Sequence, residues 1–325
     1  MIVNTKREKS LFDELRFGNN GYLGFIKIIS FIMNKKLKDL IDIYFAKASN
    51  NIISQINHFD KITNSLFILT QSLFDNKEKI EYFQRELEGK FFRFGLANQS
   101  LINLIKGNEF NLVNQNAKIV DIFSINSITR MQIESFLIIY YLLFDDISTQ
   151  EKNFRYNVYK LHGLQKQLEF NITSDFPKRK EFLNKIKKES NEAIKNIKNS
   201  EIYNSADKKT QYNYLNPKYA KLIKSKVLFE KSGIKDERVD EMWKIYSNYA
   251  HSEHISDRQY NSIYRIEKSV LKECSLVLSI NSILTSKIII NFINQFESVK
   301  NKYLQMSADK RNQVEFWSKM EDIKS

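Results

Sequence analysis

The fold is decided by residues 128–144, which read ITRMQIESFLIIYYLLF and form the most apolar part of a helix predicted from about Asn114 to Phe144. A helix with so many apolar residues must be mostly buried. Only two charged residues interrupt this part, Arg130 and Glu134, at the i, i+4 spacing that places both on one side. Because a buried charge is costly unless it is paired, this ion pair needs a structural or a functional reason.

The helical character extends to the whole chain. Only 8 glycines and 2 prolines occur among 325 residues, which is too few for the turns and bulges of an all-β or α/β protein of this length. A hydrophobic content of 42% is sufficient for a large core. We therefore predict an all-α fold, a multi-helix bundle with long antiparallel helices.

The apolar periodicity divides the chain into four parts. The first part is either an N-terminal arm or a mis-started extension, the second is a helical hairpin, the third is the main bundle, and the last is a charged tail. Within the main bundle we expect a basic helix followed by a polar loop, at residues 178–216. The four parts are residues 1–33, 34–111, 112–299 and 300–325.

The net charge of +13 favours an anionic partner such as RNA, DNA or a phospholipid surface. Arginine supplies only 11 of the 51 basic residues, and the abundance of Lys, Asn and Ile is typical of an AT-rich genome, so part of the lysine excess reflects codon usage. Residues 178–198 contain eight basic residues and only three glutamates, which indicates a solvated helix face or an RNA-facing stripe. In the polar segment Ser200–Asn216, three tyrosines are candidates for base stacking, Tyr203, Tyr212 and Tyr214.

No stable membrane insertion is expected. The longest candidate span, Leu276–Ile293, contains Asn281, Thr285 and Lys287 and is better interpreted as a buried core helix. The single cysteine, Cys274, excludes an internal disulfide and any zinc site built from cysteines. We expect a cytoplasmic protein that uses no cofactor.

The stretch most suited to chemistry is residues 243–254, WKIYSNYAHSEH, which holds two of the four histidines. On a helix, Ser247, His251 and His254 lie on one side at i, i+4 and i+7. Imidazole titrates near neutrality, so a histidine aligned with a hydroxyl is a candidate for proton transfer. A metal site is disfavoured because the two histidines have no third ligand nearby, unless Glu134 supplies one.

Three polar clusters therefore stand on three predicted helices, and a helical bundle can bring such clusters into one cavity. We state this convergence as a hypothesis. The clusters are Arg130 with Glu134, Arg155 with Tyr159, and Ser247 with His251 and His254.

An Arg-x3-Glu on an apolar helix (Arg130, Glu134), followed by a Tyr-Ser-x3-His (Tyr246, Ser247, His251), resembles a bacterial family of unknown function that is distantly related to the HEPN superfamily. The resemblance covers residues 112–293. Many HEPN proteins are metal-independent ribonucleases of toxin and antiphage systems, with a signature of Arg, four to six residues, then His. They often form dimers around the signature helix, so the resemblance implies a homodimer.

By this resemblance His251 is the signature histidine and the general base on a ribose 2′-hydroxyl, with Ser247 and Asn248 positioning it. Lys244, separated from His251 by six intervening residues, stands where the family has arginine. A lysine can stabilise the charge of a phosphorane but lacks the bidentate fork, so either Lys244 or Arg130 would hold the phosphate. The alternative is a non-catalytic interaction module in which Arg130, Glu134 and His251 only fix the packing of helices.

Overall fold

The structure is a computed structural model that describes residues 52–320, with gaps at 113–114, 170–177, 235–236, 251–253, 255–256, 259–262 and 265–266. Residues 1–33, interpreted above as an arm or an extension, lie outside the described residues. Residues 55–325 belong to one compact unit, and the contacts discussed below lie within it.

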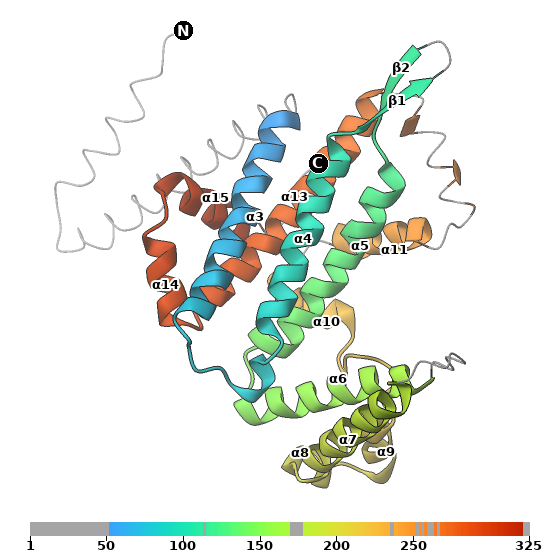
Figure 1. Cartoon of the computed structure of the whole chain (residues 1–325), viewed down its shortest axis with the longest axis vertical. Helices are drawn as coiled ribbons and strands as arrows, with labels where there is room; N and C mark the ends of the chain where they lie inside the picture. Colours follow the sequence, from blue (N-terminus) through green and yellow to red (C-terminus); the bar gives the residue numbers. More distant parts are fainter. Residues whose placement is uncertain are drawn as a thin grey trace, which may run out of the picture. The chain divides into compact units, whose positions relative to one another are not determined.

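The predicted all-α class is confirmed (Figure 1). Helices α3, α4 and α5 follow one another along the chain with alternating direction, and α4, α11 and α13 pack against α5. In chain order the helices are α3 (Ile52–Asp75), α4 (Leu87–Ile105), α5 (Ile122–Ile139), α6 (Thr149–Glu169), α7 (Arg179–Lys198), α8 (Glu201–Asn204), α9 (Lys208–Leu215), α10 (Ser225–Lys231), α11 (Glu237–Ala250), α13 (Glu267–Ile293), α14 (Glu297–Leu304) and α15 (Ala308–Ser318). A 3₁₀ turn, η2 (Tyr82–Gln84), precedes α4, and a π-helical turn, η3 (Tyr140–Phe144), follows α5.

A ladder of uncharged polar side chains crosses the core between α4, α5 and α13. Gln132 donates a hydrogen bond to Asn98 (2.6 Å), and Asn98 donates one to Thr285 (2.9 Å). Asn281 donates one to Thr129 (3.3 Å). These bonds give the Thr285 hydroxyl and the Asn281 amide group partners inside the core, which lowers the cost of burying these polar residues of α13.

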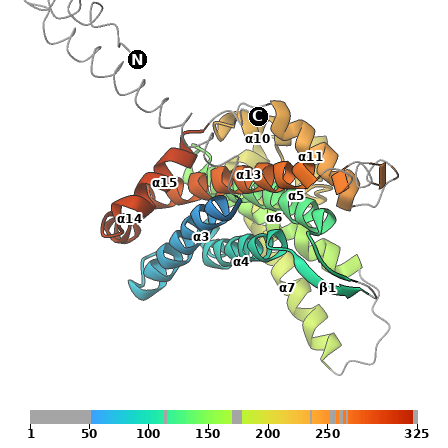
Figure 2. The same cartoon turned by 90° about the horizontal axis from the view of Figure 1, so that it is seen from above.

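Helix α13 also contains the one segment of the described residues, Ser269–Ile293, that is long and apolar enough to cross a membrane. Of its most apolar window, 67% is buried inside the protein, as in the core helix of a bundle. Figure 2, seen from above, shows α13 lying across α5 and reaching α15.

The helix predicted from Asn114 was wrong at its beginning. Two antiparallel strands, β1 (Asn108–Leu112) and β2 (Gln115–Ile119), lie there instead, with Phe110 paired to Ala117. Gly107, with a φ of 77°, ends α4 in the left-handed conformation that glycine adopts without strain. Helix α5 begins only at Ile122, because the carboxylate of Asp121 accepts the backbone N–H of Ser124 as its N-cap.

The polar loop predicted at Ser200–Asn216 is instead the two short helices α8 and α9. Ser200 caps the first and Asp207 the second, each by accepting backbone N–H groups of the first turn. Tyr203 and Tyr214 pack against the buried cluster between α6 and α7, and Tyr214 makes an edge-to-face contact with Phe154. Of the three tyrosines proposed for base stacking, Tyr212 is the exposed one.

The segment assigned to a charged C-terminal tail contains the end of α14 and all of α15. Helix α15 packs on α13, and its Val314 and Trp317 are buried. Lys61 of α3 forms an ion pair with Asp309 of α15 at 2.9 Å. The C-terminal helices therefore belong to the folded unit.

Candidate functional site

Arg130 of α5 lies where α5 packs against α11. Its Nε donates a hydrogen bond to the hydroxyl oxygen of Ser247 at 2.8 Å, and an Nη lies 3.2 Å from a carboxylate oxygen of Glu134. The guanidinium also stands 6.0 Å from the ring centroid of Trp243, within cation–π range. The structure thus brings together three predicted site residues, Arg130, Glu134 and Ser247.

The spacing of both helices produces this arrangement. Trp243 and Ser247 are four residues apart on α11 and face α5 one above the other, while the Ser247 hydroxyl donates to the carbonyl of Trp243 at 2.8 Å. The Arg130 side chain keeps 22% of its surface exposed. A guanidinium that is fixed by three neighbours and still reaches solvent can bind an anion without first becoming ordered.

The sequence analysis missed a half-buried carboxyl group on α13 that interacts with residues next to this cluster. Burial raises the pKa of Glu273 on α13, while the polar groups of Tyr246 and Asn126 act in the opposite direction. Tyr246 is 1% exposed and immediately precedes Ser247, and Asn126 is one turn before Arg130. The signal was present in the sequence, because Glu273 interrupts an apolar helix just as Arg130 and Glu134 do.

On the side of α4, Glu134 and Tyr159 border a cavity of about 260 Å³, with Lys90 and Arg93 on its wall. The Tyr159 hydroxyl accepts a hydrogen bond from Lys90 Nζ at 2.8 Å. Burial lowers the pKa of Lys221 below its usual value, and the negative charge of Glu134 offsets part of this shift. Glu134 therefore stands among several cations, of which Arg130 is paired with it directly.

Arg155 was predicted in the same site, but its partners are different. It is 4% exposed and binds Asp145 at 2.7 Å and Glu151 at 2.7 Å, while Lys231 Nζ reaches the other oxygen of Asp145 at 2.5 Å. Burial raises the pKa of Asp145, but the hydrogen bonds from Lys231 and Arg155 outweigh this and hold it below its usual value. Arg155 shares no partner with Arg130 among the described residues. It links α6 to the Tyr141 carbonyl of η3 and to Asp145, and Lys231 joins α10 to the same carboxylate.

The remaining predicted residues lie on or beyond α11. Lys244 is exposed, Asn248 is half-buried, and His254 is exposed. His251, the predicted general base, lies outside the described residues. Among the described residues, no group of three or more His, Cys, Asp or Glu side chains could hold a metal ion.

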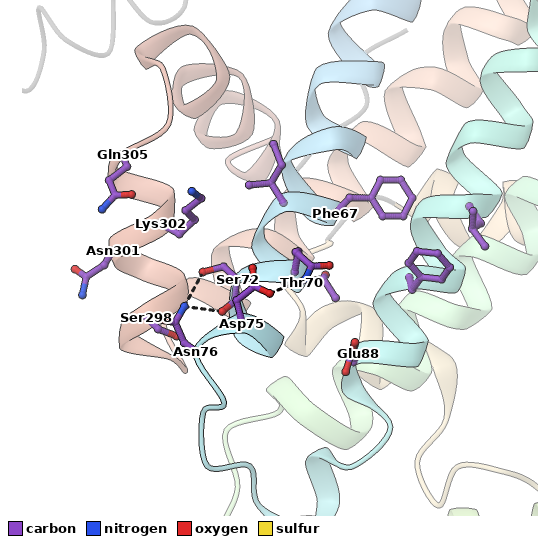
Figure 3. A pocket seen from close by; sticks show the side chains of 14 residues that line it. Phe67, Thr70, Ser72, Asp75, Asn76, Glu88, Ser298, Asn301, Lys302 and Gln305 are labelled. Carbon is purple, nitrogen blue, oxygen red and sulfur yellow. Dashed lines mark hydrogen bonds between the residues drawn. The ribbon is translucent and has the colours of Figure 1, made fainter.

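A larger groove of about 1050 Å³ runs along α3 between α14 and α4 (Figure 3). One wall is aromatic, where Phe67 meets Phe92 edge to face at 5.6 Å. Polar side chains at the end of α3 are satisfied locally: Asn76, the residue after the helix, donates to the backbone carbonyl of Ser72 (Figure 3), and Asp75 accepts from Gln71. None of the site residues predicted from the sequence lines this groove.

Comparison with known proteins adds no constraint: no family model, curated protein or solved structure matches this chain.

Proposed function

We propose that this protein binds RNA and cleaves it without a metal ion, using the junction of α5 and α11 as its site. The observation that carries the proposal is the hydrogen bond from Arg130 to Ser247, because Ser247 precedes His251 by four residues. One further turn of helix after Ser247 would align His251 with the same face of α11. The proposal agrees with the net charge of +13.

Arg130 is suited to hold a phosphate. A guanidinium has five N–H donors, and its contacts within the described residues use Nε and one Nη. The remaining donors are available for a bidentate contact to two phosphate oxygens. Lys244, exposed one residue after Trp243, supplies a second cation on α11.

In the proposed reaction, His251 accepts the proton of a ribose 2′-hydroxyl, and the 2′-oxygen attacks the adjacent phosphorus. The bond from phosphorus to the 5′-oxygen breaks, and that oxygen takes a proton from the imidazolium, which restores the neutral histidine. The products are a 2′,3′-cyclic phosphate and a 5′-hydroxyl end. Arg130 stabilises the charge that develops on the non-bridging oxygens, while Ser247 and Glu134 fix its orientation.

The test is RNA cleavage by the purified protein in EDTA, comparing wild type with His251→Ala and Arg130→Lys. Loss of the base should reduce cleavage by about 100-fold or more, and Arg130→Lys should reduce it because lysine lacks the fork. The matched control is His162→Ala, a half-buried histidine on α6, which should cleave as wild type does. Cleavage that EDTA abolishes, or that survives in His251→Ala, would contradict the proposal.

A second candidate is the non-catalytic interaction module. It is favoured by the fact that Ser247 and Glu134 already satisfy part of the Arg130 guanidinium, as in a purely structural contact. Under this hypothesis Arg130→Ala lowers the free energy of unfolding, and the wild-type protein shows no RNA cleavage. The homodimer implied by the family resemblance belongs to both hypotheses and is measured by light scattering on the full chain.

A further inference from the structure

A second concave site lies in the groove between α6 and α7, two helices that pack against each other (Figure 1). It has a volume of about 510 Å³, and no charged side chain lines it, although the protein as a whole is strongly basic. Its lining consists of side-chain amides, two aromatic rings and two hydroxyl groups, those of Ser200 and Tyr82. The amides are Gln150, Asn153, Asn157, Asn196 and Asn199, and the rings are Tyr82 and Phe154.

One of these amides is fixed by its neighbours. The carbonyl oxygen of Asn157 accepts hydrogen bonds from the Tyr82 hydroxyl at 3.2 Å and from Asn196 Nδ2 at 3.1 Å. Its own Nδ2 donates to the backbone carbonyl of Asn153 at 2.7 Å. This cluster holds the floor of the cleft in a single arrangement.

Another amide has an acceptor with no partner. The side-chain oxygen of Asn153 is shielded from solvent and accepts no hydrogen bond from the described residues. A buried acceptor without a donor is costly, and such groups in a folded protein call for an explanation. A ligand that donates a hydrogen bond at this position would supply one.

The chemistry of the lining selects the ligand. Side-chain amides offer a donor and an acceptor in one plane, which matches the edge of a nucleobase, and aromatic rings contact the faces of bases. The Arg85 guanidinium stands over the Tyr82 ring at 4.6 Å, so one face of this ring is already in contact with a cation. An uncharged cleft offers little to a bare phosphate.

Cations lie directly beside the amides on α7. Lys195 and Lys198 alternate in sequence with Asn196 and Asn199, and both lysines are exposed. The other exposed lysines of α7 are Lys180, Lys185, Lys187 and Lys188, and they outnumber its exposed glutamates, Glu181 and Glu192. A base held in the cleft would leave its phosphate outside, next to these cations.

We propose that the cleft between α6 and α7 binds a nucleobase of single-stranded RNA, with the adjoining phosphates on the lysines of α7. This inference deepens the proposed function and rests on it for the identity of the ligand as RNA. It makes α6 and α7 a binding surface separate from the residues proposed for cleavage.

The experiment measures binding rather than cleavage, on the His251→Ala protein. The four nucleoside 5′-monophosphates are titrated while side-chain amide signals are followed by NMR, with inorganic phosphate and a neutral disaccharide as parallel probes. Asn153→Leu removes an unpartnered acceptor at similar volume, so it should fold normally, and it should weaken nucleotide binding about tenfold or more. The control is Asn191→Ala, an exposed asparagine of α7 outside the cleft, which should bind as the parent does.

Stronger binding of a nucleotide than of phosphate, lost in Asn153→Leu and kept in Asn191→Ala, supports the proposal. Equal binding of phosphate and nucleotides, insensitive to Asn153, would show that only the lysines bind and would overturn it. Binding of the disaccharide in place of nucleotides, or no binding at all, would overturn it too. Because cleavage is measured separately, nucleotide binding without ribonuclease activity would refute the proposed function and leave this site standing.

Discussion

The Nε of Arg130 lies 2.8 Å from the hydroxyl oxygen of Ser247, although 117 positions separate the two residues in the chain. This bond joins α5, the most apolar helix identified in the sequence, to α11, the helix that contains residues 243–250 of the stretch with two histidines. It orients a cation at the surface of a well-packed helix pair. The proposed chemistry depends on this orientation.

Ser247→Ala should loosen that cation. A hydrogen bond to a charged group contributes about 1.5–3 kcal/mol, so we expect the free energy of unfolding in urea to fall by up to about that amount. RNA binding should weaken as well, because Arg130 would have to become ordered on binding. Ser247→Thr keeps the hydroxyl group and should retain both properties, and equal losses in the two variants would show that the hydrogen bond is not responsible.

Among substitutions of a carboxylate by an amide in these polar clusters, Asp145→Asn should be the most destabilising. It leaves Arg155, which is 5% exposed at its side chain, without its buried counter-ion. Removing one partner of a buried ion pair costs about 3–5 kcal/mol. The matched substitution Glu151→Gln alters an exposed partner of the same arginine and should cost about 1 kcal/mol or less, as measured by urea unfolding near neutral pH.

The same carboxylate predicts an acid-sensitive stability. Because the pKa of Asp145 is lowered in the folded state by Lys231 and Arg155, its contribution is present above its ordinary pKa and is lost as the pH falls through the lowered value. Asp145→Asn should lack this component. The difference in unfolding free energy between wild type and the variant should therefore shrink on acidification, and a constant difference would contradict the assignment.

Glu273 predicts the opposite dependence. Its pKa is raised by burial, so the folded state favours the protonated carboxyl group, and stability declines as the pH rises from the ordinary value through the raised one. Glu273→Gln stays neutral and escapes this decline. Its stability relative to wild type should improve as the pH rises above the ordinary pKa of a glutamic acid, and parallel pH profiles would show that the carboxyl group is not perturbed.

Much of the helical core followed from the sequence. The scarcity of glycine and proline indicated the all-α class, and Leu276–Ile293 was expected to be a core helix; in the structure two of its polar residues bond to Asn98 and Thr129 of neighbouring helices. The strand pair before α5 was missed because its residues 115–119 were added to the apolar pattern that follows. The N-cap at Asp121 marked the true boundary.

The site was predicted only in part, for a physical reason. Periodicity showed which residues share a face of one helix, and it correctly associated Arg130 with Glu134. It could not show which helices pack together, so Arg155 was assigned to a common site, although its side chain forms an ion pair with Asp145 instead. The amide cleft between α6 and α7 depends entirely on such packing, because single asparagines carry no periodic signal.

The most direct test of the central claim is the chemical identity of the RNA ends produced in EDTA. We predict 2′,3′-cyclic phosphate and 5′-hydroxyl ends from the wild-type protein, none from His251→Ala or from RNA with 2′-O-methyl groups, and wild-type products from His162→Ala. Intact RNA with the wild-type protein, or the same ends from His251→Ala, would contradict the account.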